Sequence, residues 1–265
     1  MTEVLAAATH DAHPIPFTPW DRFFASWSWR QGEHVTVIGP TGTGKTTVIR
    51  AILPKRYAAG GAVNVLATKS LDRNLESWAR RDRLTVVRDW PPRAPQWWRP
   101  PTDHVEEGRR VPWQNRLMTW PSHKGLALGA IDDHVADVHR RALTDMFWQG
   151  HWCIVAEELF ELSEIGLDKE LSKVWTQGRS AGLSLVGATQ RPVGIPLFAY
   201  SQASHLFLFG DNDEVNLRRL QGIGGMSGTT LRDAVSALRG HDVLYVGTRT
   251  RQLVRTRVPV RKGSA

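Results

Sequence analysis

The chain has 265 residues, of which 41% are hydrophobic and 23% charged. This length and composition suit one large α/β domain, and they exclude an intrinsically disordered chain. The single cysteine, Cys153, allows no internal disulfide and no cysteine-based zinc site, so we expect a reducing, cytoplasmic setting. No apolar run reaches the ~18 residues typical of a transmembrane helix, so no membrane partner is expected.

The charge balance is basic. Lysine and arginine number 34 against 26 aspartates and glutamates, which gives a formal net charge of +8. An excess of this size favours a polyanionic partner such as nucleic acid. The alternative is that the basic groups are scattered and only keep the chain in solution.

The first part of the chain indicates a lead-in over residues 1–31, followed by alternating strands and helices. Three prolines precede an aromatic cluster that packs on the domain or covers an adenine ring. The cluster consists of Trp20, Phe23, Phe24, Trp27 and Trp29. Apolar runs predict strands over 34–39, 63–67 and 84–87, and a helix over 45–53 that Pro54 terminates.

The stretch 90–125 differs from the rest of the chain. It holds seven of the 15 prolines and five of the 12 tryptophans, which excludes a continuous helix. We interpret it as a surface insertion with a short edge strand over 116–120. Its Trp97 and Trp98 could stack on bases and its arginines could hold phosphates, although a solvated loop is the alternative. The arginines in question are Arg93, Arg99, Arg109, Arg110 and Arg116.

The second half continues the alternation. Helices are predicted over 131–148, 168–177, 211–220 and 229–238, with a glycine-rich break at Gly222, Gly224 and Gly225. Strands are predicted over 152–156, 183–188 and 205–209, and 242–246 pairs with 253–260. The predicted fold is therefore α/β: a mainly parallel central sheet with flanking helices and a C-terminal antiparallel strand pair. One domain spans 32–262, and 263–265 form a tail.

Residues 39–46 match the phosphate-loop pattern G-x-x-x-x-G-K-[ST] at every fixed position, between a predicted strand and a predicted helix. The loop N–H groups and the positive end of the helix bind phosphate, the lysine reaches the β- and γ-phosphates, and the threonine hydroxyl binds Mg²⁺. The predicted nucleotide-binding residues are Gly39, Pro40, Thr41, Gly42, Thr43, Gly44, Lys45, Thr46 and Thr47.

Two further strand ends carry polar side chains. The strand 152–156 ends in Glu157 and Glu158, where one carboxylate can support Mg²⁺ and the next can polarise the attacking water. They could also simply begin a solvated helix. The strand 183–188 ends near Gln190, whose amide can contact the γ-phosphate and water. Arg179, just upstream, could act in a neighbouring subunit's site, or form a surface salt bridge or a DNA contact.

These blocks resemble one known family. The runs GPTGTGKTT at 39–47, IVAEELFEL at 154–162 and GRSAGLSLVGATQRP at 178–192 are similar to the FtsK–HerA superfamily of P-loop motor ATPases. The run 203–225 also fits that group, and the resemblance covers about residues 33–247. The chain is closer in size and content to the compact ATPases of viruses and mobile elements, including genome-packaging motors, than to the bacterial chromosome translocases.

The resemblance implies a parallel-stranded ATPase core, a ring that is commonly hexameric, and ATP-driven movement of DNA without regard to base sequence. Carried over by position, Lys45 and Thr46 contact phosphate and metal, Glu158 is the catalytic glutamate and Gln190 the polar sensor. Glu157 lies at the position where the family usually has aspartate, and the resemblance implies that it binds the metal ion.

Two other functions compete with a DNA motor. One is an ATP-driven assembly or secretion component with slow hydrolysis, which the extra methylene of Glu157 favours. The other is a small-molecule kinase, for which 90–125 would be the lid, although a water-activating Glu158 has little use there. For the motor, Arg218 and Arg219 on the late helix join the insertion arginines as candidate DNA contacts.

Overall fold

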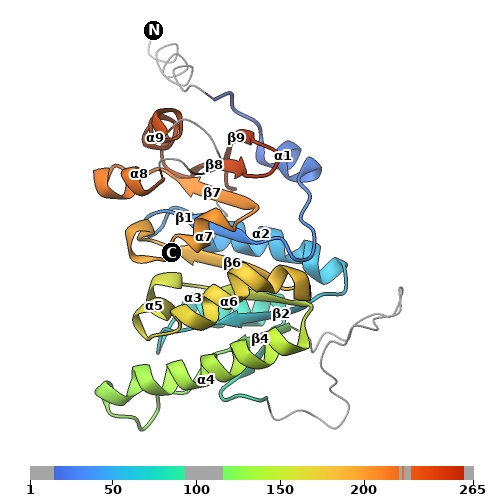
Figure 1. The fold of residues 1–265 in the computed structure, drawn as a ribbon, viewed down its shortest axis with the longest axis vertical. Coiled ribbons are helices and arrows are strands. Elements are labelled where there is room, and N and C mark those ends of the chain that lie inside the picture. The colour runs from blue at the N-terminus through green and yellow to red at the C-terminus, as the bar shows by residue number, and fades with distance from the viewer. Residues whose placement is uncertain (1–14, 93–115, 221–222, 224–227, 260–265) are drawn as a thin grey trace.

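A computed structural model describes residues 15–92, 116–220, 223 and 228–259 of the chain. These residues form a nine-stranded sheet in the order β3-β4-β2-β5-β6-β1-β7-β8-β9, with helices on both faces (Figure 1). The strands are β1 Val35–Ile38, β2 Ala62–Leu66, β3 Thr85–Val87, β4 Arg116–Thr119, β5 Trp152–Ala156, β6 Ser184–Thr189, β7 His205–Phe209, β8 Asp242–Gly247 and β9 Gln252–Arg257.

The first seven strands of this order, from β3 at the edge through β1 to β7, run parallel to one another. Strand β8 pairs antiparallel with β7, and β9 pairs antiparallel with β8. The predicted fold class is therefore confirmed. Every residue of β1, β2, β5, β6 and β7 is buried. These strands are covered on both faces, which explains their continuous apolar runs.

One face of the sheet carries three helices: α1 Trp20–Ser26, α2 Lys45–Ala58 and α3 Arg73–Asp82. Phe23 and Trp27 pack against Phe207 of β7, and Phe23 also contacts Tyr245 of β8. The aromatic cluster therefore covers the sheet, as the packing interpretation predicts.

The opposite face carries the remaining helices, whose buried side chains form one apolar cluster with the sheet. These are α4 Leu128–Gln149, α5 Leu159–Glu164, α6 Asp168–Gln177, α7 Phe198–Ser201, α8 Glu214–Leu220 and α9 Gly228–Ser236. The short 3₁₀ segments η2 Gly178–Ala181 and η3 Pro192–Gly194 complete this layer.

Two local predictions are wrong. Pro54 does not end its helix, because α2 continues to Ala58. Leu53 is fully buried and Arg56 is bound to the carbonyl of Arg30 and the hydroxyl of Ser184. These tertiary contacts outweigh the ~3 kcal/mol that an interior proline costs a helix. The strand at 116 is not at the edge, since β4 lies between β3 and β2.

The predicted insertion is smaller than 90–125, because its two ends belong to the core. Trp90 is 1% exposed and donates to Asp145 of α4 over 2.7 Å, while Trp120 is 3% exposed and donates to the carbonyl of Lys69. Several residues that the sequence singles out lie outside the described residues: Arg93, Arg99, Arg109, Arg110, Trp97, Trp98, Gly222, Gly224 and Gly225.

Candidate active site

The phosphate loop leaves β1 at the carboxyl edge of the sheet and leads directly into α2. Gly39 has room for hydrogen only, because a Cβ there would lie 2.5 Å from the Cβ of Phe209 on the neighbouring strand β7. Gly44, the N-cap of α2, has φ 118°, a backbone conformation that side chains strongly disfavour. The motif glycines are thus required by the path of the loop, and the helix begins at Lys45 as predicted.

Lys45 turns back onto its own loop. Its Nζ donates to the carbonyls of Gly39 and Pro40 over 2.7 and 3.0 Å. Burial lowers the pKa of this amine, and the charges of Glu158 and Glu157 raise it. Both carboxylates are therefore close enough to Lys45 to act on its charge, as a nucleotide site between the loop and β5 requires.

Glu158 is the buried member of the acidic pair, with 4% of its surface exposed. Its carboxylate caps α5 by accepting from the N–H of Phe160 over 3.4 Å. Burial raises the pKa of Glu158, while Lys45, this backbone N–H and a hydrogen bond with Gln190 oppose the rise. A carboxylate with a raised pKa is a stronger base toward water.

Glu157 is in a different environment from Glu158. Its Oε1 lies 3.4 Å from Nζ of Lys69, which also pairs with Asp72 at 3.6 Å. Its Oε2 is buried and has no hydrogen-bond partner among the described residues. Burial raises the pKa of Glu157, and Lys69 lowers it. One oxygen thus remains available for another ligand.

Gln190 connects the phosphate loop to the acidic strand. Its Oε1 accepts from the hydroxyl of Thr41 over 2.5 Å, and its side chain is also hydrogen-bonded to Glu158. The two contacts use opposite ends of one amide. The structure therefore brings together Lys45, Glu158 and Gln190 from three separate segments, at the carboxyl edge of the parallel strands.

Arg179 lies away from this cluster. It is exposed in η2, which precedes β6, whereas Gln190 follows that strand. Six strand residues separate the two ends by about 20 Å. Arg179 therefore lies at the opposite edge from the loop of its own chain, and a part in hydrolysis would have to be played in another subunit.

Sequence reasoning missed two residues of this region. Nδ1 of His241, just before β8, hydrogen-bonds the carbonyl of Thr43 over 2.8 Å. Lys69, after β2, pairs with Glu157. The position of Lys69 after a strand of the same sheet was an available signal. No signal pointed to His241, because 198 residues separate it from Thr43.

Comparison with protein families gives one match. The ABC transporter family model matches residues 24–100, a segment that contains the phosphate loop but not the acidic strand β5. No curated protein matches the chain.

Solved structures match over most of the chain. The genome packaging NTPase B204 of Sulfolobus turreted icosahedral virus 2, with sulfate, superposes with a TM-score of 0.61 at 15% identity, covering 88% of this chain and 99% of B204. VirB4 of Thermoanaerobacter pseudethanolicus gives a TM-score of 0.60 at 11% identity, covering 86% and 90% of the two chains. The chain therefore shares its P-loop NTPase fold with these proteins.

A third example of this P-loop ATPase fold is the cytoplasmic domain of the type VII secretion ATPase EccC from Thermomonospora curvata. Its TM-score is 0.52 at 15% identity, and the match covers 89% of this chain and 26% of EccC. Among the described residues of our chain, no helix combines the length and apolar character needed to cross a bilayer.

Proposed function

We propose that this chain is an ATP-hydrolysing motor that moves or packages DNA as a homo-oligomeric, hexameric ring. The observation that carries the proposal is the convergence of Lys45, Glu158 and Gln190 at the end of a parallel sheet. The B204 fold supports it, because that protein is a genome packaging NTPase and was also determined with ATP-gammaS.

Each residue has a distinct task in this proposal. The N–H groups of the phosphate loop and the first turn of α2, including Thr47, hold the phosphates, and Lys45 exchanges its loop carbonyls for β- and γ-phosphate oxygens. Glu158 accepts a proton from the attacking water. Gln190 lies between Thr41 and Glu158, so it can report to Glu158 whether the loop is occupied.

Thr46 and Glu157 are the residues that would hold Mg²⁺. Thr46 is exposed at the first turn of α2, and the unpartnered Oε2 of Glu157 offers the hard oxygen that this ion prefers. In the described part of the chain, no three His, Cys, Asp or Glu side chains converge on a metal position. The site therefore fits an ion that arrives with the nucleotide and neutralises phosphate charge.

The position of Arg179 supports ring assembly, because it is exposed and far from its own phosphate loop. If it completes the neighbour's site, Arg179→Ala protein is inactive alone. Mixing it with Lys45→Ala protein then restores part of the ATPase rate, since some interfaces combine an intact loop with an intact arginine. The absence of rescue at every mixing ratio, in rings confirmed by light scattering, would leave Arg179 without a role in trans.

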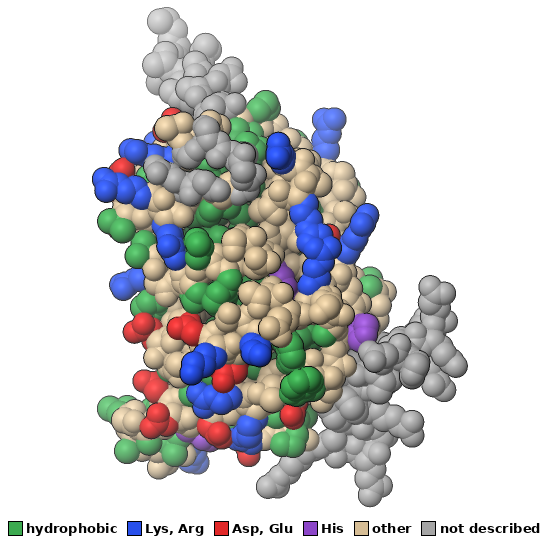
Figure 2. Space-filling view, in the orientation of Figure 1, with side chains coloured by type: hydrophobic (Ala, Val, Ile, Leu, Met, Phe, Trp, Pro, Cys, Tyr) green, Lys and Arg blue, Asp and Glu red, His purple; other side chains and the backbone are tan. Residues whose placement is uncertain are grey.

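The DNA partner is inferred from charge. In the view of Figure 2, basic side chains prevail around α1, α8 and β9, whereas basic and acidic side chains alternate over α4–α6. Of the predicted contacts on α8, Arg218 is exposed, although it pairs with Glu214 at 3.6 Å. Arg219 instead donates to the carbonyl of Ile195 and lies over the ring of Tyr200. Arg218 is therefore the better candidate.

The test of the proposed function is the ATPase rate with and without DNA. We expect linear duplex DNA of any base composition to raise the steady-state rate severalfold at low salt, with the stimulation falling steeply as salt rises. The reason is that binding through phosphates releases counterions, and bound DNA completes the working state of a motor. An ATPase rate that DNA does not change at low salt would reject DNA as the partner.

The alternative is an ATP-driven assembly or secretion component that hydrolyses slowly. The ion pair of Glu157 with Lys69 favours it, because a carboxylate held by lysine is less available to a metal. The EccC fold is the corresponding precedent. A slow rate that is indifferent to DNA, together with tight ATP binding, would support this function.

A further inference from the structure

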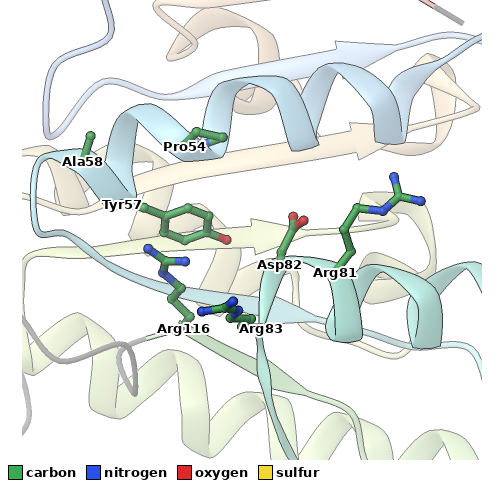
Figure 3. A pocket seen from close by; sticks show the side chains of 7 residues that line it. All are labelled: Pro54, Tyr57, Ala58, Arg81, Asp82, Arg83 and Arg116. Atoms are coloured by element: carbon green, nitrogen blue, oxygen red, sulfur yellow. The ribbon is translucent and has the colours of Figure 1, made fainter. Parts of the chain in front are cut away.

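An open, arginine-lined pocket lies at the amino edge of the parallel strands, opposite the phosphate loop. It has a volume of about 490 Å³ and lies where α2 and α3 end and β4 begins (Figure 3). Its lining consists of Pro54, Tyr57, Ala58, Arg81, Asp82, Arg83 and Arg116. Helix α2 has 14 residues, so about 20 Å separates this pocket from the nucleotide site at its other end.

The positive charge of the pocket is not neutralised from within. Its one acidic group, Asp82, accepts from the indole N–H of Trp78 over 2.8 Å and pairs with Arg50 at 3.5 Å. Arg81, Arg83 and Arg116 form no ion pair with any described residue. Three arginines that line one open pocket create a local positive potential, which attracts an anion.

Tyr57 adds a hydrogen-bond donor to this charge. Its hydroxyl oxygen is buried and has no hydrogen-bond partner within the described part of the chain. Burial and the nearby Asp82 raise the pKa of the phenol, so it keeps its proton and can donate. Arg116 lies 4.0 Å from the centroid of the Tyr57 ring. That ring face is therefore already stacked and is not offered to a nucleobase.

The arrangement favours an extended ligand over an enclosed one. In the view of Figure 3, Arg83 and Arg116 both lie below Tyr57, while Arg81 extends from α3 away from these two arginines. Small-molecule sites usually bury most of their ligand, whereas this pocket is open to solvent. Several separate arginines around an open pocket can contact phosphates that are spaced along an extended chain.

We propose that this pocket binds the phosphodiester backbone of DNA, an inference that rests on the proposed DNA motor. It gives the motor a DNA contact that is separate from the nucleotide site. The arginines hold successive phosphates without reading base sequence, as a translocating protein requires. Because the length of α2 separates the pocket from the phosphate loop, DNA bound in the pocket does not compete with ATP.

The test compares two double variants by fluorescence anisotropy with a mixed-sequence duplex across a salt series. R81Q/R83Q removes two charges from the pocket and leaves the Arg116–Tyr57 stack intact. K169Q/K173Q is the matched control, because Lys169 and Lys173 are two exposed cations on α6, away from the pocket and from the basic surface around α1, α8 and β9. Thermal unfolding and the ATPase rate without DNA establish that each variant is folded and active.

For R81Q/R83Q we expect DNA affinity to fall about tenfold or more near 0.1 M salt, and the slope of log K against log salt to shrink by about two. The control keeps the wild-type slope. If R81Q/R83Q and wild type had equal slopes, or if both variants lost the same DNA affinity, the pocket would not be a DNA-binding site. The proposed DNA motor would be unaffected by that result. Wild-type protein that binds no DNA at low salt would overturn the motor and the pocket together.

Discussion

Replacing Lys45 with alanine is expected to abolish ATP hydrolysis, with at least a ~10³-fold loss, and to leave the fold intact. Lys45 is the cation of the phosphate loop, and positioned charge is the main means by which such sites accelerate phosphoryl transfer. Among the described residues its Nζ bonds to the carbonyls of Gly39 and Pro40 and forms no ion pair, so its removal should leave the fold unchanged. The measurement is the steady-state ATPase rate beside a thermal unfolding curve.

Lys169→Ala is the matched control for this experiment, because Lys169 is an exposed lysine on α6. It should hydrolyse ATP at the wild-type rate. Near wild-type turnover in Lys45→Ala would show that the nucleotide site is not at this loop.

Glu158→Gln should retain ATP binding and lose turnover by at least ~10²-fold, which is the usual contribution of a positioned base. The amide keeps the size of the side chain and can still accept from the N–H of Phe160, so the start of α5 is preserved. It cannot accept the proton of water. Binding is measured with a fluorescent ATP analogue, and turnover by phosphate release.

Two comparisons make this prediction specific to Glu158. Glu164→Gln, at the exposed end of α5, should be silent. Glu157→Asp should keep or raise the ATPase rate, because aspartate is the residue that the resembling family usually has at this metal-binding position. A milder loss in Glu158→Gln than in Glu157→Gln would mean that the two carboxylates have exchanged roles.

Local pattern predicted much of this fold. The bounds of β5, α6 and β7 agree with prediction, because each element is an apolar or amphipathic run with clear ends. The phosphate loop was predictable for a related reason. Its glycines are required by backbone path, and such requirements appear directly in the residue types.

The predictions that proved wrong concern elements whose structure depends on contacts between residues far apart in the sequence. Pro54 remains helical because Arg56 is bound by β6 and the segment before β1. The place of β4 in the sheet depends on pairing with β2, more than 50 residues upstream. Within the site, the contact of Thr41 with Gln190 spans 149 residues. The order of strand ends suggested that they meet, but the hydrogen bond itself required the structure.

The central claim, that ATP hydrolysis moves this protein along DNA, is tested most directly by displacement of a third strand from a duplex. A triplex-forming oligonucleotide is placed at one end of a linear duplex, and its release is followed by fluorescence. We predict release by wild-type protein with ATP, none with ATP-gammaS, and none by Lys45→Ala. DNA-stimulated ATP hydrolysis that leaves the third strand in place at every duplex length and orientation would contradict the motor.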